Sequence, residues 1–336
     1  MTPAGNFHKI LTMKVFITGA TGFIGSHLID YYLSNYKNIE IFALVRNINN
    51  LKWLKSLKIN FLEGNLFSIP PLPSDLNYII HLAGLTLSSH MANYYTVNQQ
   101  GTASLFQSIS SQKISPQKIV VLSSLAAAGP SLDCQPIKEN SSPQPITPYG
   151  MSKLKGEFEA LKYREMLPLV ILRAAGVFGP RDRDFLAYFK FIKKGILPSL
   201  SEQRQLSLCY VKDLVRAIDL SCQKNLESGE IINVADPQPY HWDEFGRAAG
   251  EALGKKLIKI KIPLPILTLT ASFLEIIAHL RGQPSLLNRY RIRDMKVKCW
   301  IADVTKAWSL LSFKPSYALK EAIQETIAWY LNHNWL

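Results

Sequence analysis

The stretch Lys14-Val15-Phe16-Ile17-Thr18-Gly19-Ala20-Thr21-Gly22-Phe23-Ile24-Gly25 lies near the start of this chain and decides its fold. Its first residues form a short, largely apolar run with β-branched members, which predicts a buried strand. Residues 26–33 contain no Gly or Pro and predict a helix. A strand, a glycine-rich turn and a helix, in this order, can hold a pyrophosphate at the helix N-terminus.

Each of the three glycines has a steric reason in such a turn. Gly19 makes the tight turn, Gly22 lets backbone N–H groups approach the pyrophosphate, and Gly25 lets the helix pack closely on the strand. The dipole of the helix adds a field that favours an anion. The segment therefore predicts a dinucleotide-binding turn, with a generic glycine-rich turn as the alternative.

The second predicted strand, residues 39–45, bears on the choice of cofactor. It ends in Leu44-Val45 and is followed by Arg46-Asn47, with no carboxylate. In this kind of fold a carboxylate holds the ribose hydroxyls of NAD, whereas an arginine suits the 2′-phosphate of NADP. Arg46 therefore favours NADP over NAD, unless it is simply a solvated arginine at the end of a strand.

Two serines follow another buried run, Lys118-Ile119-Val120-Val121-Leu122. A hydroxyl at the carboxyl end of a parallel strand points into the ligand crevice. Ser123 and Ser124 are therefore candidate site residues, and ordinary turn chemistry is the alternative.

Tyr149 and Lys153 stand four residues apart, so on a helix they share one face. A tyrosine has an ordinary pKa of about 10, and a neighbouring ammonium favours the phenolate and lowers that pKa. The pair can then move a proton to or from a carbonyl or alcohol oxygen.

Together these segments resemble the extended short-chain dehydrogenase/reductase superfamily, also called the NAD-dependent epimerase/dehydratase family, over residues 13–330. The resemblance rests on ordered motifs: residues 18–25, His81-Leu82-Ala83-Gly84, Val97-Asn98-Gln99-Gln100-Gly101-Thr102, Ser124 before Gly129, Tyr149 with Lys153, residues 172–182, and Tyr210-Val211-Lys212-Asp213-Leu214.

The resemblance implies roles for individual residues. Ser124, Tyr149 and Lys153 are expected to be catalytic, and no metal is expected. The expected cofactor-binding residues are Gly19, Thr21, Gly22, Phe23, Ile24, Gly25, Arg46, Asn65, Leu66, Leu82, Ala83, Gly84, Asn98, Ser123, Tyr149, Lys153, Ala174 and Val177. A homodimer through helices near residues 91–111 and 149–162 is typical of the family.

Three positions depart from the family pattern. Asn65 stands where an aspartate is usual, although its amide oxygen can still accept from an adenine amine. Ala174-Ala175 replaces a proline-containing segment. Leu206 occupies the position of an arginine that holds the phosphates of nucleotide sugars, and Arg204 is two residues away, which disfavours a nucleotide-sugar substrate.

The predicted fold is an α/β fold, with a Rossmann-type doubly wound parallel sheet of about seven strands and a smaller, mostly helical C-terminal part that binds substrate. The strands are expected near residues 14, 40, 60, 79, 119, 170 and 231. Residues 13–180 with 212–236 are assigned to the NAD(P)-binding domain and residues 181–211 with 237–336 to the substrate-binding part, with residues 1–12 as a loose extension. The active site is expected between the two parts.

Bulk composition fits a cytoplasmic enzyme. The chain has 336 residues and four cysteines without paired metal spacing, which we expect to be reduced. The net charge of +13 comes from dispersed residues without a nucleic-acid motif, so no nucleic-acid partner is expected.

Residues 262–298 contain two further features. The basic residues Arg289, Arg291, Arg293, Lys296 and Lys298 nearly alternate, which predicts a solvated strand face; an anionic membrane surface or a substrate's phosphates are the alternatives. An apolar stretch precedes them, and Leu267, Phe273, Leu274, Ile277 and Leu280 could form one helix face. Core packing or a lid over the substrate is favoured for this face, with a peripheral membrane contact as the alternative.

The predicted function is hydride transfer between a nicotinamide cofactor and a ketone or secondary alcohol of a lipophilic or small substrate. The apolar C-terminal part resembles that of 3β-hydroxysteroid dehydrogenases and dihydroflavonol reductases. The alternative is a nucleotide-sugar epimerase or dehydratase with tightly bound NAD. The dehydratase is disfavoured because Met151, Ser152 and Leu125 add no acid–base group. A non-catalytic cofactor sensor is disfavoured because Ser124, Tyr149 and Lys153 are all present.

Overall fold

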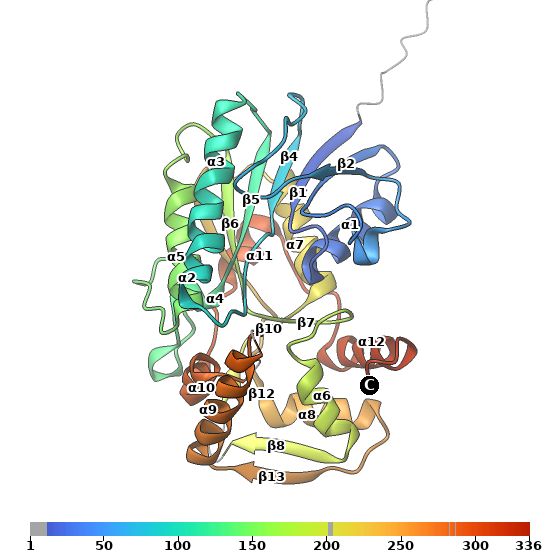
Figure 1. Ribbon diagram of the computed structural model, residues 1–336, viewed down its shortest axis with the longest axis vertical. Helices are drawn as coiled ribbons and strands as arrows, with labels where there is room; N and C mark the ends of the chain where they lie inside the picture. Colours follow the sequence, from blue (N-terminus) through green and yellow to red (C-terminus); the bar gives the residue numbers. More distant parts are fainter. Residues whose placement is uncertain (1–11, 201–203, 282, 286) are drawn as a thin grey trace, which may run out of the picture.

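A seven-stranded parallel sheet forms the centre of the upper half of the molecule in Figure 1, a computed structural model that describes residues 12–200, 204–281, 283–285 and 287–336. The strand order is β11-β6-β5-β4-β1-β2-β3, and every pairing is parallel. The strands are β1 (Met13–Thr18), β2 (Ile39–Val45), β3 (Asn60–Glu63), β4 (Tyr78–His81), β5 (Lys118–Ser124), β6 (Leu169–Ala174) and β11 (Glu230–Val234). All seven predicted strands and the fold class are confirmed.

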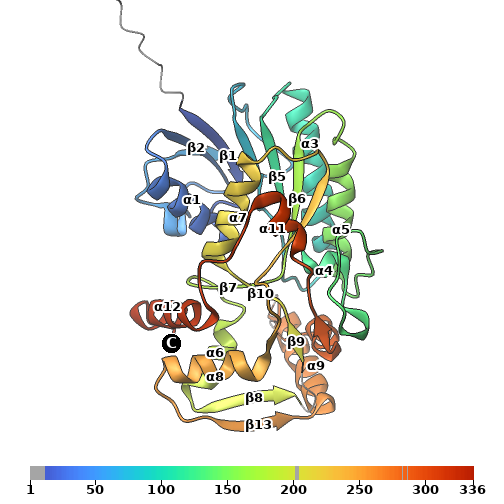
Figure 2. The same cartoon turned by 180° about the vertical axis from the view of Figure 1, so that it is seen from behind.

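Helices cover both faces of this sheet, as Figures 1 and 2 show from opposite sides. One face carries α2 (Met91–Tyr95), the π-helix η2 (Thr96–Gln100), α3 (Gly101–Ser111) and α5 (Pro148–Leu161); the other carries α1 (Phe23–Asn35), α7 (Val211–Gln223) and α11 (Thr305–Leu311). In β1, Val15 and Ile17 join the core on the α1 and α7 side, whereas Phe16 joins the core on the α3 side. Burial on both faces explains why the strand sequences are apolar runs rather than alternating ones.

The order of the strands changes direction between β1 and β4. Strands β2 and β3 lie on one side of β1, and β4, β5, β6 and β11 lie on the other. Doubly wound sheets bind ligands at this switch point, outside the carboxyl ends of the strands. The turn after β1 and the turn after β4 meet there, which places the predicted dinucleotide turn at the switch point.

The lower part of Figure 1 contains most of the remaining elements. They are α6 (Leu186–Lys193), β8 (Ile196–Leu200), β9 (Gln205–Leu206), β12 (Tyr240–His241), α8 (Trp242–Ala252), β13 (Ile258–Ile262), α9 (Leu264–Leu280), α10 (Arg289–Lys296), β14 (Cys299–Trp300) and α12 (Leu319–Asn332). Strand β7 (Gly176–Phe178) pairs with β10 (Leu208–Tyr210), and the short helices η1 (Lys52–Leu54), α4 (Leu125–Ala128) and η3 (Leu132–Cys134) lie in loops. An aromatic core around Phe178, Phe189, Phe245 and Tyr330 packs α6, α8 and α12 together.

The prediction of a strand face for the basic cluster is wrong, because Arg289–Lys296 forms helix α10. The side chain of Asn288 caps this helix by accepting from the backbone N–H groups of Tyr290 and Arg291, at 3.0 Å each. Arg289, Arg291 and Arg293 therefore point in different directions: Arg289 and Arg293 are exposed, and Arg291 lines the cleft described below. A capping asparagine favours a helix over a strand, whatever the charge spacing that follows it.

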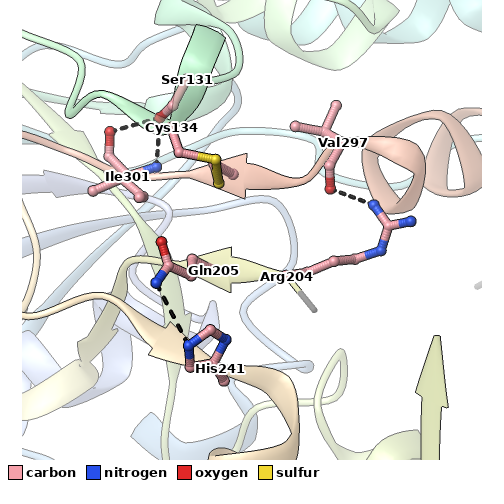
Figure 3. The surroundings of a disulfide bond; sticks show 8 residues. Ser131, Cys134, Arg204, Gln205, His241, Val297 and Ile301 are labelled. Carbon is pink, nitrogen blue, oxygen red and sulfur yellow. Dashed lines mark hydrogen bonds between the residues drawn. A yellow bond between two sulfur atoms is a disulfide. The ribbon is translucent and has the colours of Figure 1, made fainter. Parts of the chain in front are cut away.

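The prediction that all four cysteines are reduced is also wrong. Cys134 in η3 and Cys299 in β14 form a disulfide with a Cα–Cα distance of 5.2 Å, although they are 165 residues apart in sequence. Ser131 holds the same two segments together, because its Oγ donates to the carbonyl of Ile301 at 3.0 Å (Figure 3). Cys209 and Cys222 are free and buried, as expected.

Candidate active site

A cleft of about 2040 Å³ runs from the carboxyl edge of the sheet into the lower part of the molecule. Most of the predicted site residues line it: Gly19, Thr21, Gly22, Phe23, Ile24, Gly25, Leu82, Gly84, Ser123, Ser124, Tyr149, Lys153, Ala174 and Val177. Arg46, Asn65, Leu66, Ala83 and Asn98 are not among the residues that line it. The cleft therefore brings the glycine-rich turn and the predicted acid–base residues to one place.

The glycine-rich turn has the geometry that a dinucleotide requires. Gly19 has φ +75°, and a Cβ there would lie 2.6 Å from the backbone nitrogen of Ala83. A Cβ on Gly25 would lie 2.3 Å from the carbonyl oxygen of Gly19. Gly22 is the N-cap of α1 and has no side-chain hydrogen bond to the helix. The first N–H groups of α1 thus face the cleft without a side-chain cap, so these residues fit the pyrophosphate of NAD or NADP.

A buried hydrogen-bond chain fixes the position of the two turns. The Nδ1 of His81 lies 2.7 Å from Thr18 Oγ1, its Nε2 lies 3.0 Å from Thr102 Oγ1, and Thr18 Oγ1 accepts from the N–H of Ala83. Thr102 donates its own hydroxyl to the carbonyl of Asn98, so it must accept from His81, which assigns the proton of the imidazole to Nε2. Burial lowers the pKa of His81 to about 3, which keeps this network neutral.

Asn98 lies on the π-helix η2 and positions other residues. Its Oδ1 accepts from the N–H of Leu85 at 2.8 Å, and its Nδ2 donates to the carbonyl of Leu85 and to Ser152 Oγ. Ser152 in turn donates to the carbonyl of Tyr149 at 2.7 Å. Asn98 therefore ties the loop after β4 to the helix that carries the acid–base pair.

Three predicted cofactor ligands, Asn65, Leu66 and Arg46, do not line the cleft. The Oδ1 of Asn65 accepts from the N–H of Phe67 at 2.8 Å, which uses one of the two lone pairs of the atom expected to accept from adenine. Leu66 is buried and packs against Gly101. Arg46 is exposed directly after β2 and outside the cleft lining. Their contacts with a cofactor stay predictions.

Ser123 lines the cleft, but its hydroxyl is hydrogen-bonded to a buried ion pair. Its Oγ donates to Glu157 Oε1 at 2.5 Å, and Arg173 holds the same carboxylate through two hydrogen bonds of 3.0 and 2.7 Å. The side chains of Arg173 and Glu157 are only 2% and 1% exposed. The sequence analysis did not single out this pair. The available signal was Glu157, four residues after Lys153 on the same helix face.

Ser124 and Tyr149 are brought together by two helix N-termini. Ser124 caps α4, and its Oγ accepts from the N–H of Ala126 at 3.2 Å. Thr147 caps α5 by accepting from the N–H of Gly150, and a Cβ on Gly150 would lie 2.3 Å from the carbonyl oxygen of Ala126. This close approach of α5 to α4 brings the hydroxyl of Ser124 near enough to Tyr149 to oppose the rise in the Tyr149 pKa.

The expected lowering of the Tyr149 pKa is not seen. Burial raises the pKa of Tyr149, while the hydrogen bond from Ser124 and the charge of Arg291 oppose that rise. The Nζ of Lys153 donates to the carbonyl of Leu122 at 2.6 Å, and burial lowers the pKa of Lys153 to about 8. Lys153 thus lies on the same cleft wall as Tyr149, with its ammonium directed at the end of β5.

The far end of the cleft is lined by charged side chains, including Arg204, Arg247 and Arg291. Arg291 pairs with Asp184 at 2.7 Å, and Arg204 donates to the carbonyl of Val297 at 2.6 Å (Figure 3). Leu206, at the expected arginine position, also lines the cleft. The sequence analysis named Arg204, two residues before Leu206, and gave a substrate's phosphates as an alternative role for the cluster that contains Arg291. It did not identify Arg247 on α8, which no motif marks.

Comparisons with known proteins found a matching family model, relatives and structures of similar fold. The model of the NAD dependent epimerase/dehydratase family matches residues 15–235. An uncharacterised UDP-glucose epimerase of Bacillus subtilis is 28% identical, over 94% of this chain and 98% of that protein. Ceramide reductase of Caulobacter vibrioides is 24% identical over 96% of each chain. The crystal structure of UDP-glucuronic acid 4-epimerase from Bacillus cereus, with UDP-glucuronic acid and NAD, superposes with a TM-score of 0.76 at 22% identity, over 96% of this chain and 100% of that one.

Proposed function

The chain belongs to the NAD-dependent epimerase/dehydratase family, and we propose that it is an NAD-dependent epimerase of a nucleotide sugar. The observation that carries the proposal is a cleft that joins the glycine-rich turn, Ser124 with Tyr149 and Lys153, and a far end where three arginines lie among acidic residues. One end suits a dinucleotide, the middle suits proton transfer at a hydroxyl, and the far end suits phosphates.

The proposed chemistry is a reversible oxidation at one sugar carbon. Bound at the glycine-rich turn, NAD would supply the acceptor for the hydride that leaves the carbon bearing the hydroxyl group. Tyr149 as its phenolate accepts the hydroxyl proton, so the C–O bond becomes a carbonyl and both atoms and electrons balance. Ser124 donates a hydrogen bond to the same oxygen. Tyr149 then returns the proton when the carbonyl is reduced from its opposite face, which inverts the carbon.

Lys153 supports this proton transfer in the proposal. Its ammonium is half-buried on the same helix face as Tyr149 and favours the phenolate once it turns from the Leu122 carbonyl toward the ring oxygen. The charge of Arg291 already opposes the rise in the Tyr149 pKa. Arg291 therefore contributes to the same electrostatic effect from the substrate side of the cleft.

The residues around Ser124 favour an epimerase over a dehydratase. Loss of water from the sugar needs a further acid and base beside the reacting carbons. Leu125 and Ala126, which follow Ser124 and line the cleft, carry no such group. Ser152 donates its hydroxyl to the carbonyl of Tyr149, which occupies it within the helix.

Arg204, Arg247 and Arg291 are the proposed ligands of the nucleotide sugar's phosphates. Guanidinium groups suit this task because they stay charged and present several donors in one plane. The leucine at position 206, where an arginine is usual in enzymes of nucleotide sugars, therefore does not argue against this substrate, because arginines at other positions line the cleft.

We favour NAD over NADP, contrary to the preference drawn from Arg46. The Bacillus cereus epimerase structure contains NAD, and Arg46 lies outside the cleft lining. The competing proposal is a reductase of a lipophilic ketone, which the ceramide reductase among the relatives supports.

One assay separates the two proposals. Purified protein is incubated with UDP-glucose, UDP-glucuronic acid and related nucleotide sugars, with and without added NAD, and in parallel with NADPH and a lipophilic ketone. The products of both reactions are followed by NMR. We expect inversion at one sugar carbon with no net consumption of cofactor. NADPH-dependent reduction of a ketone, without any change in the nucleotide sugars, would replace this proposal with the reductase.

A further inference from the structure

Helix α9 (Leu264–Leu280) presents two adjacent apolar faces with different surroundings. Leu267, Thr270 and Leu274, spaced by three and four residues, line the cleft. The neighbouring positions carry large apolar side chains that are not covered by the described parts of this chain. The prediction that this apolar stretch packs in the core is wrong for Phe273 and Leu280, which are exposed, and closure over substrate stays a prediction for the face that lines the cleft.

The uncovered face is a continuous stripe. Ile266, Leu269, Phe273, Ile276 and Leu280 follow one another at spacings of three, four, three and four residues, which places them along one side of the helix. They are 56%, 72%, 64%, 61% and 81% exposed, respectively. We call these five residues the α9 stripe. Contiguous exposed apolar surface of this kind marks an interaction site rather than ordinary surface.

Basic residues flank the α9 stripe on both sides. Strand β13 leads into α9 and exposes Lys259 and Lys261, together with Ile258 and Ile260. Helix α10 packs beside α9, as Figure 1 shows, and exposes Arg289, Arg293 and Lys296. Residues 258–298 contain eight basic and two acidic residues, so this region carries a strong positive charge.

We propose that the α9 stripe docks on the surface of an anionic lipid bilayer, with the helix lying in the plane of the interface. An apolar helix face with basic flanks suits this surface, because the apolar side chains enter the acyl boundary while the cations meet anionic headgroups. No helix in the described part of the chain is long and apolar enough to cross a membrane. The contact is therefore peripheral.

Charge argues against a second copy of this chain as the occupant. The spacing of the α9 stripe would also suit pairing with an identical helix. A two-fold pair through α9 would, however, bring the excess of cations in residues 258–298 close to the same excess on its partner. Like charges in that arrangement repel, whereas an anionic bilayer attracts them.

The docked orientation has a consequence for the cleft. The cleft-lining face of α9 adjoins the α9 stripe, and Ile266 belongs to both. A bilayer bound to the stripe would therefore lie beside one wall of the cleft. The proposal does not depend on the reaction proposed above, because it rests on exposure and charge alone.

Co-sedimentation with vesicles tests the proposal. The full-length protein is mixed with vesicles of phosphatidylcholine alone or of phosphatidylcholine with phosphatidylglycerol. We expect binding to the anionic vesicles to exceed binding to the neutral ones by about tenfold or more, and to weaken with added salt. Equal binding to both vesicle types, or no binding to either, would overturn the proposal.

Two double variants locate the contact. Leu269→Glu with Phe273→Glu should weaken binding to anionic vesicles by about tenfold or more, because it removes two inserted side chains and adds anionic charge. Phe67→Glu with Met166→Glu is the matched control, since Phe67 and Met166 are 55% and 66% exposed elsewhere on the surface. Equal losses in both variants would overturn the assignment to α9.

Sedimentation velocity without lipid tests the competing occupant. We expect the Leu269→Glu, Phe273→Glu variant to keep the oligomeric state of the wild type and its circular dichroism spectrum. Conversion of an oligomer to a smaller species by this variant would show that a second copy covers the α9 stripe, and would overturn the membrane proposal.

Discussion

At the scale of single residues, two of the three proposed acid–base residues, Ser124 and Tyr149, are held in place by helix caps, whereas the third, Lys153, carries a charge that burial makes unfavourable. Ser124 and Tyr149 are held by the caps of α4 and α5, whereas Lys153 places an ammonium in a half-buried position against the Leu122 carbonyl. Burial lowers the pKa of Lys153 to about 8, from an ordinary value of 10.5. The folded protein therefore disfavours the charge that the proposed chemistry needs.

This pKa predicts how stability depends on pH. Between the folded value near 8 and the unfolded value near 10.5, the unfolded chain holds the Lys153 proton and the folded protein has lost it, so stability rises with pH. Lys153→Met removes this contribution. From pH 8 to 9.5, the wild type should gain about 1–2 kcal/mol of unfolding free energy relative to the variant, measured by urea denaturation. Parallel pH curves for the two proteins would refute the assigned pKa.

Ser124, Tyr149 and Lys153 could be named as candidate catalytic residues because the order and spacing of residues in a motif can be read directly from the sequence. The direction of a side chain is not local. Ser123 turns to Glu157 and Asn65 turns to Phe67, and in both cases a partner outside the motif decides the orientation. Residue types at motif positions therefore predicted the lining of the cleft better than they predicted individual contacts.

At the scale of elements, η2 links the cofactor side of the cleft to the acid–base helix. Asn98 makes three hydrogen bonds in a buried position, to both backbone groups of Leu85 and to Ser152. Gly156 lets α5 approach this point, because a Cβ there would lie 2.3 Å from the Asn98 carbonyl oxygen. The π-helix thus fixes α5 relative to the loop after β4.

Removal of this link should affect stability and turnover together. Asn98→Ala leaves the buried polar groups of Leu85 and Ser152 without their partner, which costs about 2–4 kcal/mol of unfolding free energy. The same change releases α5 and should lower kcat more than it raises KM for substrate. The control is Gln99→Ala, on the same π-helix, which removes only a long contact of 3.4 Å with Glu159. Equal effects of both changes would argue against a positioning role for Asn98.

The strands of the central sheet could be predicted because burial on both faces leaves an apolar run in the sequence. The helices α9 and α10 were harder to predict from the sequence, because neither has a single apolar face that packs on one hydrophobic core. Helix α9 has apolar residues both on its cleft-lining face and on its uncovered face, which blurs its period. The alternation of charges in α10 resembles a strand unless Asn288 is recognised as the cap of a helix.

At the scale of the whole molecule, the disulfide joins segments that no local pattern connects. Cys134 follows β5 and α4, and Cys299 follows α10, so only the complete fold brings them together. The bond joins η3 to β14, the strand that pairs with β9 beside Arg204, and its two cysteines are 165 residues apart in sequence. Rules that predict disulfides or metal sites from the short spacing of cysteines could not predict this bond between distant residues.

The disulfide should make stability sensitive to reductant. Closing so long a loop restricts the unfolded chain, so reduction should lower the free energy of unfolding by about 2–5 kcal/mol. The measurement is urea denaturation with and without dithiothreitol. The Cys134→Ser, Cys299→Ser variant is the control and should not respond to the reductant, because Cys209 and Cys222 remain as free thiols. If dithiothreitol leaves the urea midpoint of the wild type unchanged, the prediction is wrong.

The central claim is that Tyr149 transfers the proton in an NAD-dependent reaction within this cleft. The most direct test is the turnover of the Tyr149→Phe variant on a nucleotide sugar that the wild type epimerises, with NAD binding measured in parallel by thermal shift. We predict that turnover falls by about 10²–10⁴-fold while NAD stabilises both proteins equally. Unchanged turnover in the Tyr149→Phe variant would contradict the account.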